Sequence, residues 1–416
     1  MKLSPLARRL YEEFADLAVI GAHEHLPAEA DYLAFGHSGP NLFAGGHIWH
    51  DLESAGLAPE FKATLRDGGH RPVESWWPAI RPHWEQIRHG SYARALLITA
   101  QDLYGLSEIS DRTIGELAAR VQADNAPGLY HRILQERCRA RVSITCVDQA
   151  AFPDDPGLRG ITSLQKFDRW SSPLTVLSTR LGREVRSLEE TAAAAQELLR
   201  DDLARGALGF KMTVAEHRPP DLTAAEAEVT RLVRTGESSP CPALLDYLFD
   251  KCLDVAAESG VPVAVHTGYW GDFRELDPKL LLSFALRRRD VRFDLFHLGM
   301  PMVRDASLIG KSLPNVTLNL CWCAAISQLM TARALAELVD LVPLNKVIAF
   351  GGDYRVAVQK VYGHLVMAKE TVASALAEHM ELDAFDKEEA LRIARLWFHD
   401  NPARIYGLET PEAPRP

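Results

Sequence analysis

The chain has 416 residues, of which 47% are hydrophobic and 25% charged, and its formal net charge is -10. This composition is typical of a globular protein with one large domain or two to three small ones. The negative charge argues against nucleic acid or an anionic membrane as the main partner. Residues 1–9 lack the apolar core of a signal peptide, and no apolar run approaches the roughly 20 residues of a membrane span.

The six cysteines form no Cys-x-x-Cys pair, so we interpret them as reduced thiols of a cytoplasmic protein. We expect a small-molecule substrate, with neither nucleic acid nor a membrane as a partner. The sequence leaves a homo-oligomer open.

The first predicted strand ends in two histidines separated by one residue. After a predicted helix over residues 5–16, the apolar run 17–20 indicates a buried strand, and His23 and His25 follow it. Side chains alternate along a strand, so the two imidazoles point the same way and Glu24 points the opposite way. Neutral imidazole is a ligand of Zn, Fe, Ni or Mn. The pair is placed to bind one cation, although surface or packing histidines share this pattern.

Residues 26–139 show no alternating strand pattern. They contain helical stretches at 92–103 and 112–122, the second with Ser110 or Asp111 as its predicted cap. We interpret 26–139 as a helical insertion within one domain, because no linker of Pro, Gly or Ser composition bounds it. Its mixed polar and aromatic residues suit a lid over a polar ligand, with His50 and Asp51 as candidate substrate contacts. Core or interface aromatics explain the same composition equally well.

Strands and helices alternate through the rest of the chain. The predicted strands after the first are 140–147, 173–177, 206–212, 261–266, 291–297, 316–322 and 347–353. The predicted helices are 187–205, opened by Ser187, 242–259, stopped by Gly260, 362–379 and 387–399. Residues 214–242 are expected to form a loop with a helical piece. Eight strands alternating with helices predict a single α/β domain over 1–416, a (β/α)8 TIM barrel with the insertion after the first strand.

Ionisable residues recur where the predicted strands end: His25, Lys211, His266, His297 and Asp353. Active sites of TIM barrels lie at this C-terminal face, and converging charges are costly unless they are paired or bound to metal. Together with His23, three of these residues (His25, His266 and Asp353) supply the nitrogen and oxygen ligands of a catalytic Zn-type ion. Taken singly, each has another explanation: a core histidine, a turn aspartate or a salt-bridged lysine.

These residues make the chain resemble the amidohydrolase superfamily, in the branch near uronate isomerases and metal-dependent decarboxylases. The resemblance runs from His23 to Tyr406, and its motifs are His23-Glu24-His25, Gly209-Phe210-Lys211, Val265-His266-Thr267-Gly268, Phe296-His297 and Gly352-Asp353-Tyr354-Arg355. It implies that the His-x-His pair, His266 and Asp353 bind metal and that Asp353 takes the proton from a metal-bound water. It also implies that His297 either binds a second metal or polarises the substrate.

Lys211 bears on the number of metal ions. Its strand looks like the one whose lysine becomes carboxylated and bridges two metals in ureases and phosphotriesterase-like enzymes. With His297 as a ligand, that set would hold two ions. The alternative is one ion, with Lys211 and His297 as free catalytic groups. We expect one divalent ion, Zn in preference to Mn, Fe or Ni.

Arg355 follows Asp353 as in the uronate isomerase pattern, where the arginine grips a carboxylate, a contact that suits a planar guanidinium; a surface arginine is the alternative. His266 departs from that pattern, because uronate isomerases as a group do not rely on a fifth-strand ligand. Trp270, Arg274 and Trp322 would line the rim of the pocket as substrate contacts.

We therefore expect a metal-dependent hydrolase in which a metal-activated water attacks a small polar, carboxylate-bearing substrate. Asp353 would shuttle the proton and His297 would support the developing oxyanion. The alternatives are a non-hydrolytic decarboxylase or uronate-isomerase-like enzyme, and a catalytically inactive binding protein.

Overall fold

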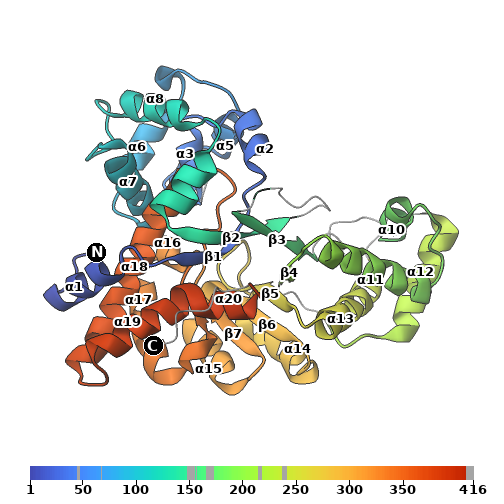
Figure 1. Cartoon of the computed structure of the whole chain (residues 1–416). Coiled ribbons are helices and arrows are strands. Elements are labelled where there is room, and N and C mark those ends of the chain that lie inside the picture. The colour runs from blue at the N-terminus through green and yellow to red at the C-terminus, as the bar shows by residue number, and fades with distance from the viewer. Residues whose placement is uncertain are drawn as a thin grey trace. The chain divides into compact units, whose positions relative to one another are not determined.

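The computed structural model describes residues 1–44, 47–66, 68–147, 155, 157–164, 173–213, 218–236 and 241–408 (Figure 1). The chain divides into two compact units. Unit 1 comprises Met1–Thr145, Pro153–Arg159 and Leu320–Ala403, and unit 2 comprises Cys146–Phe152, Gly160–Asn319 and Arg404–Pro416. Each unit is described by itself below. One domain over 1–416 stays a prediction.

Eight parallel strands form one sheet in the order β1 to β8. They are β1 (Val19–Glu24), β2 (Ala140–Val147), β3 (Leu158–Ser163), β4 (Phe210–Thr213), β5 (Pro262–His266), β6 (Arg292–Phe296), β7 (Val316–Asn319) and β8 (Val347–Ile348). Main-chain hydrogen bonds also join β1 to the segment after β8, from Ala22 N to Phe350 O (3.0 Å) and from Asp353 N to His23 O (2.9 Å). The sheet is a near-closed barrel, which confirms the predicted α/β barrel class.

Unit 1 holds the helices between β1 and β2, as predicted for the insertion after the first strand. They are α2 (Glu29–Phe35), α3 (Asn41–Ala44), α4 (Ile48–Ser54), α5 (Pro59–Arg66), η1 (Val73–Ser75), α6 (Trp77–Ile87), α7 (Ser91–Tyr104), α8 (Ile114–Asp124) and η2 (His131–Arg137). The other helices that begin in this unit are α1 (Pro5–Phe14), α16 (Cys323–Ile326), α17 (Gln328–Leu341), η5 (Leu344–Lys346), α18 (Gln359–Glu381), α19 (Lys387–Arg395), η6 (Leu396–Asp400) and α20 (Asn401–Ile405).

Unit 2 places its helices between β3 and β7. They are α10 (Pro173–Leu181), α11 (Leu188–Ala204), α12 (Leu222–Thr235), α13 (Pro242–Ser259), η3 (Pro278–Leu281), α14 (Leu282–Arg287), η4 (His297–Gly299) and α15 (Val303–Ser312). Within the segment predicted as a loop with a helical piece, α12 is that piece, and residues 214–217 and 237–240 lie outside the described residues.

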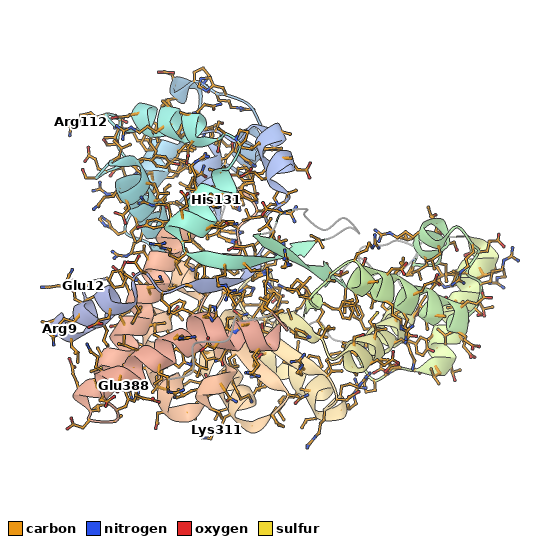
Figure 2. The ribbon with its side chains drawn as sticks, in the orientation of Figure 1. Arg9, Glu12, Arg112, His131, Lys311 and Glu388 are labelled. Atoms are coloured by element: carbon orange, nitrogen blue, oxygen red, sulfur yellow. The ribbon has the colours of Figure 1, made fainter. Side chains whose placement is uncertain are left out.

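Local sequence signals explain where the helices lie. In α1, Ala7, Leu10 and Phe14 are buried on one face, while Arg9 and Glu12 project away from the ribbon (Figure 2). The Ser187 hydroxyl accepts a hydrogen bond from Glu190 N at the start of α11 and forms a capping box with that residue. Gly260 ends α13 in the left-handed conformation, with φ at 64°. Both predicted helix signals are confirmed.

Two predictions of local structure were wrong. Residues 173–177, predicted as the third strand, begin helix α10, since a proline is well tolerated in the first turn of a helix. The third strand is Leu158–Ser163, in which Arg159 and Gly160 interrupt the apolar pattern. The predicted cap of α8 also fails, because this helix begins at Ile114 after Thr113 and has no side-chain cap bond.

The seventh and eighth strands end earlier than predicted. They stop at Asn319 and Ile348, and the predicted strand ends Trp322 and Asp353 lie beyond them with left-handed backbone, at φ of 65° and 62°. This conformation is incompatible with an extended strand. The site residues are therefore presented by the segments that follow the strands.

The register of unit 2 sorts polar from apolar residues. Lys211 pairs with Ala264, Ala264 with Asp294, and Asp294 with Thr317, so these four share one face of the sheet. The opposite face carries the apolar series Phe210, Val263, Phe293 and Val316, whose members also pair in register. The polar row gives this part of the sheet its ionisable side chains.

The six cysteines are free and buried, in agreement with the expectation of reduced thiols. No helix in the described part of the chain has the length and apolarity to cross a membrane.

Candidate metal centre

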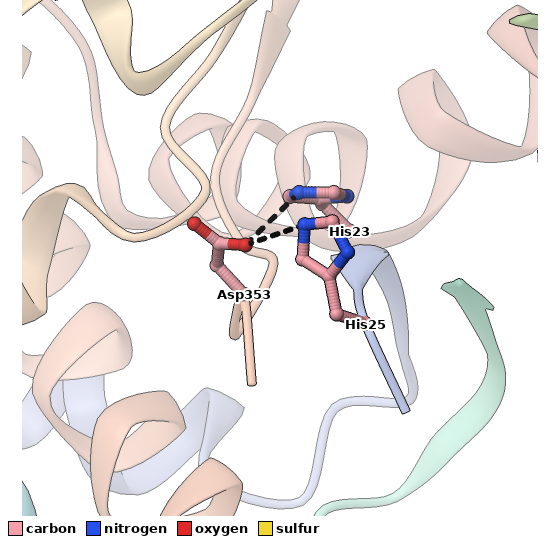
Figure 3. Close-up of side chains that lie close together, drawn as sticks. All are labelled: His23, His25 and Asp353. Atoms are coloured by element: carbon pink, nitrogen blue, oxygen red, sulfur yellow. Dashed lines mark ion pairs between the residues drawn. The ribbon is translucent and has the colours of Figure 1, made fainter. Parts of the chain in front are cut away.

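Three side chains of unit 1 converge at the ends of β1 and β8. His23 Nε2 lies 3.0 Å and His25 Nε2 lies 3.3 Å from Asp353 Oδ1 (Figure 3). One ligand atom from each residue lies within 4.8 Å of the other two. The His23 side chain is fully buried and that of Asp353 nearly so, whereas His25 keeps 28% of its surface exposed. Solvent, and therefore an ion or a substrate, reaches the three side chains from the side of His25.

The main chain around these ligands fixes their directions. Asp353 N–H donates to His23 O at 2.9 Å, and His25 N–H donates to Tyr354 O at 2.9 Å. Asp353 has φ at 62°, a left-handed conformation that costs a non-glycine residue free energy unless its surroundings enforce it. The conformation turns the carboxylate of Asp353 toward the two imidazoles.

The two carboxylates at this place have opposite pKa shifts. Burial alone would raise the pKa of Asp353, but His23, by its charge and hydrogen bond, and His25 hold that pKa well below its usual range. Glu24 is also buried, and burial raises its pKa well above the usual range although Tyr354 N–H and Gly352 N–H donate to it. Asp353 is thus held as an anion, the form in which a carboxylate binds metal.

The chemistry of these donors fits a divalent cation. Two imidazole nitrogens and one carboxylate oxygen are the ligand types that Zn and related ions take, and three protein ligands leave a coordination position open. His25 Nδ1, on the far side of its ring, is buried without a hydrogen-bond partner among the described residues. His23, His25 and Asp353 therefore form a possible metal site, as the sequence predicted for these three.

His47, to which the sequence analysis gave no role, also lies beside Asp353. Its Nε2 lies 3.0 Å from Asp353 O and 3.7 Å from Asp353 Oδ2. Burial lowers the pKa of His47, although Asp353 opposes this, so the ring is neutral near pH 7. Because a carbonyl oxygen only accepts hydrogen bonds, we assign the ring proton to Nε2, which donates to Asp353 O.

Aromatic rings line the side of His47. The ring of Trp322 lies 4.1 Å from that of His47, and Tyr92 and His50 stack at centroid distances of 6.0 and 6.2 Å. Trp322 is fully buried. The structure thus brings the predicted contacts Trp322 and His50 together with His47.

Asp51, the other predicted contact from the insertion, is partly buried. Burial raises its pKa to about 6, against the opposing charge of Lys360. Lys360 is fully buried, and its Nζ donates to Leu42 O at 3.2 Å. Burial lowers the pKa of Lys360 to about 7.

In unit 2, the predicted residues His266 and His297 contact each other. His266 Nδ1 lies 3.0 Å from His297 Nε2, with the rings 4.4 Å apart. His297 is fully buried and has φ at 64°. Lys211 is also buried, and its Nζ lies 4.2 Å from the centroid of the Phe296 ring. Metal binding by His266, His297 or Lys211 and catalytic roles for His297 and Lys211 stay predictions.

Unit 2 also holds a buried carboxylate, Asp294, on strand β6. Asp294 accepts hydrogen bonds from Thr317 Oγ1 at 3.0 Å, Asn319 Nδ2 at 2.8 Å and Tyr406 Oη at 2.7 Å. Burial raises the pKa of Asp294, while these three donors and the charge of Lys211 oppose the rise. The network ties the last described segment of the chain to β6.

The remaining predicted substrate contacts are exposed. Trp270 is 48% exposed, with its ring edge-on to His266 at 6.5 Å. Arg274 forms hydrogen bonds with Asp272 in the same surface loop, so its charge already has a local partner. Arg355 is exposed two residues after Asp353. Their contacts with a substrate stay predictions.

The sequence analysis missed His47, Glu24 and Asp294 as site residues. Glu24 and Asp294 carried a usable signal, since an acidic residue inside a buried strand needs hydrogen-bond donors. His47 carried none, because only the fold brings it to Asp353.

Comparison with known proteins gives three solved structures of similar fold. A uronate isomerase from Thermotoga maritima has a TM-score of 0.79 at 15% identity and covers 97% of this chain and 98% of its own. A glucuronate isomerase from Caulobacter crescentus has a TM-score of 0.78 at 16% identity, with coverages of 99% and 96%. A protein provisionally named a metal-dependent hydrolase, from Lactobacillus casei, has a TM-score of 0.66 at 16% identity and covers 98% of each chain.

None of the curated proteins compared matches the chain. The sequence pattern of one protein family, described as amidohydrolase, matches residues 179–408. This match spans more than half of the 416 residues. The chain therefore belongs to this amidohydrolase family.

Proposed function

We propose that this protein is a metal-dependent isomerase that interconverts the aldose and ketose forms of a uronate-type sugar acid. The observation that carries the proposal is the group of His23, His25 and Asp353, whose ligand atoms lie within 4.8 Å of one another. Two of the similar folds named above are a uronate isomerase and a glucuronate isomerase, each matching nearly the whole chain. At these low identities the likeness supports the reaction class only together with the ligand group.

A divalent ion held by the three ligands would supply Lewis-acid polarisation of a substrate oxygen. Asp353 Oδ1 faces both histidines, whereas Oδ2 faces His47. In the proposed reaction the Asp353 carboxylate accepts a proton from the substrate. An aldose–ketose conversion needs such a proton acceptor, because a proton leaves C2, a proton arrives at C1, and the oxygen-bound protons are redistributed.

His47 is proposed to assist this transfer. It holds Asp353 through the main-chain oxygen at 3.0 Å and so helps to keep the carboxylate in place. The neighbouring rings of Trp322 and Tyr92 limit how His47 can rotate. Arg355 is proposed to bind the substrate carboxylate, a contact for which its planar fork is suited.

The test is product analysis with the metal-loaded full chain. Hexuronates are incubated with protein supplied with Zn²⁺ or Mn²⁺, and the products are examined by mass spectrometry and NMR. Isomerisation gives a ketose product with the mass of the substrate. A product heavier by one water would indicate hydrolysis, and loss of carbon dioxide would indicate decarboxylation; either result would contradict the proposal.

A metal-dependent hydrolase is the second candidate, and His266 is the observation that favours it. This histidine ends β5, where a fourth ligand was predicted, and its Nε2 is buried. The Zn²⁺ affinity of the variant His266→Ala distinguishes the two candidates. The isomerase proposal expects Zn²⁺ affinity within about threefold of wild type, whereas loss of a true ligand should weaken it by tenfold or more.

A further inference from the structure

Glu24 stands between the two candidate histidine ligands, and its side chain is fully buried. Its carboxylate binds the loop that follows β8. Oε1 accepts a hydrogen bond from Gly352 N–H at 2.9 Å, and Oε2 accepts one from Tyr354 N–H at 2.8 Å. These two donors flank Asp353, the third candidate ligand.

Three successive N–H groups of the loop therefore donate to β1. Gly352 and Tyr354 donate to the Glu24 side chain, and Asp353 donates to His23 O. In an extended strand, successive N–H groups point to opposite sides and cannot all reach one neighbour. The left-handed turn at Asp353, with φ at 62°, allows all three to do so.

The loop approaches β1 too closely for side chains larger than hydrogen. A Cβ on Gly352 would lie 2.4 Å from Glu24 Oε1, and a Cβ on Gly351 would lie 2.7 Å from His23 N. Neither distance is possible for a carbon atom without displacement of the neighbour. The Gly-Gly pair and the Glu24 carboxylate are thus fitted to each other.

We propose that Glu24 is a positioning residue of the metal centre, whose carboxylate holds Asp353 in the turn that directs Oδ1 at His23 and His25. Strand β1 then serves the centre from both of its faces. The histidines of one face bind the ion, and the acid of the other face orients the remaining ligand. The inference rests on the proposed metal site.

The test measures metal affinity in the full chain, by competition of Zn²⁺ and Co²⁺ with a chromophoric chelator. The variants Glu24→Ala and Glu24→Gln are expected to bind 10- to 100-fold more weakly, the range typical of residues that orient a ligand. Glu24→Gln should lie between wild type and Glu24→Ala, because its amide accepts from one N–H while its NH₂ opposes the other donor. The absorption bands of bound Co²⁺ should also shift, since the ligand geometry changes.

Asp202 provides the matched control. It is a carboxylate in α11 that is only 2% exposed and accepts a hydrogen bond from Arg205 at 3.1 Å. Asp202→Asn should lower the melting temperature of the metal-free chain and leave both metal affinities unchanged. If Glu24→Ala does not fold, Gly352→Ala replaces it, since the added Cβ displaces the same carboxylate oxygen while Glu24 remains.

The inference is overturned if the Glu24 and Gly352 variants melt at lower temperature but bind Zn²⁺ and Co²⁺ within about threefold of wild type with unchanged Co²⁺ bands. Glu24 would then serve the fold alone. Failure of the wild-type chain to bind either ion is a different result, which would overturn the proposed function itself.

Discussion

In unit 1, the main chain orients the three candidate ligands: hydrogen bonds between β1 and the loop after β8 set the directions of His23, His25 and Asp353. In unit 2, the ionisable residues are held mainly by other side chains. His266 contacts His297, and Asp294 collects three side-chain donors. The unit 1 group thus depends on the contacts that fix its backbone, those of the Glu24 carboxylate among them, whereas each ionisable group in unit 2 depends on its own side-chain partners.

This difference has a consequence for function. A metal site needs its ligand atoms in place before the ion arrives, because reorganisation lowers affinity. The arrangement in unit 1 meets that requirement, with two ligands on a strand and the third on a turn that this strand pins.

The largest expected effect follows from removal of the ligand charge in unit 1. Asp353→Asn keeps the size of the side chain but removes the anion that both histidines face. We expect turnover of the uronate substrate to fall by about 10³-fold, since the proton acceptor is lost as well as the ligand. Steady-state kinetics and metal analysis of the same preparation measure both effects. Turnover within tenfold of wild type would contradict a role for Asp353.

A second effect concerns the buried Lys360 of unit 1. Unfolded lysine titrates near 10.5 and folded Lys360 near 7, so the unfolded chain binds more protons between these pH values, and stability rises with pH there. From pH 7 to pH 9 the wild type should gain up to about 3 kcal/mol in the free energy of unfolding. Lys360→Met should flatten this rise. Urea unfolding at several pH values measures this rise in the free energy of unfolding. Parallel pH profiles of wild type and variant would contradict the lowered pKa of Lys360.

The smallest effect tests the network of unit 2. Tyr406→Phe removes one of the three donors to Asp294, at 2.7 Å, without changing the size of the ring. We expect the free energy of unfolding to fall by about 1 to 3 kcal/mol, because a buried acceptor loses a partner. Thr317→Val, which removes another donor, is the companion variant. Combined with Tyr406→Phe, it should give a non-additive loss; strict additivity would show that the donors act independently.

Much of the fold could be predicted from the sequence, since alternating apolar strands and capped helices are local patterns. The third strand was the exception, because Arg159 and Gly160 break its pattern and the segment beginning at Pro173 has an apolar run as short as a strand. The ends of β7 and β8 were also misplaced. Positive φ at Trp322 and Asp353 is imposed by tertiary contacts, and composition does not reveal it.

The site could be predicted only in part, because some of its contacts are local in the sequence and others form only in the fold. The ligand types and their places after strands indicated His23, His25 and Asp353, and the structure brings those three together. The contacts of His47 and Glu24 with the loop at Asp353 span more than three hundred residues of sequence. Neither partner is visible until the chain is folded. For Arg274 the sequence suggested a substrate contact at the rim of the pocket, but the structure pairs its side chain with the nearby Asp272.

The central claim is that His23, His25 and Asp353 bind one divalent ion. The most direct test is metal analysis of the purified full chain after loading with Zn²⁺ or Mn²⁺ and removal of excess ion, beside Asp353→Asn. We predict about one ion per chain in the wild type, a raised melting temperature, and almost none in the variant. Fewer than ~0.2 ions per wild-type chain, with no change in melting temperature on adding either ion, would contradict the claim.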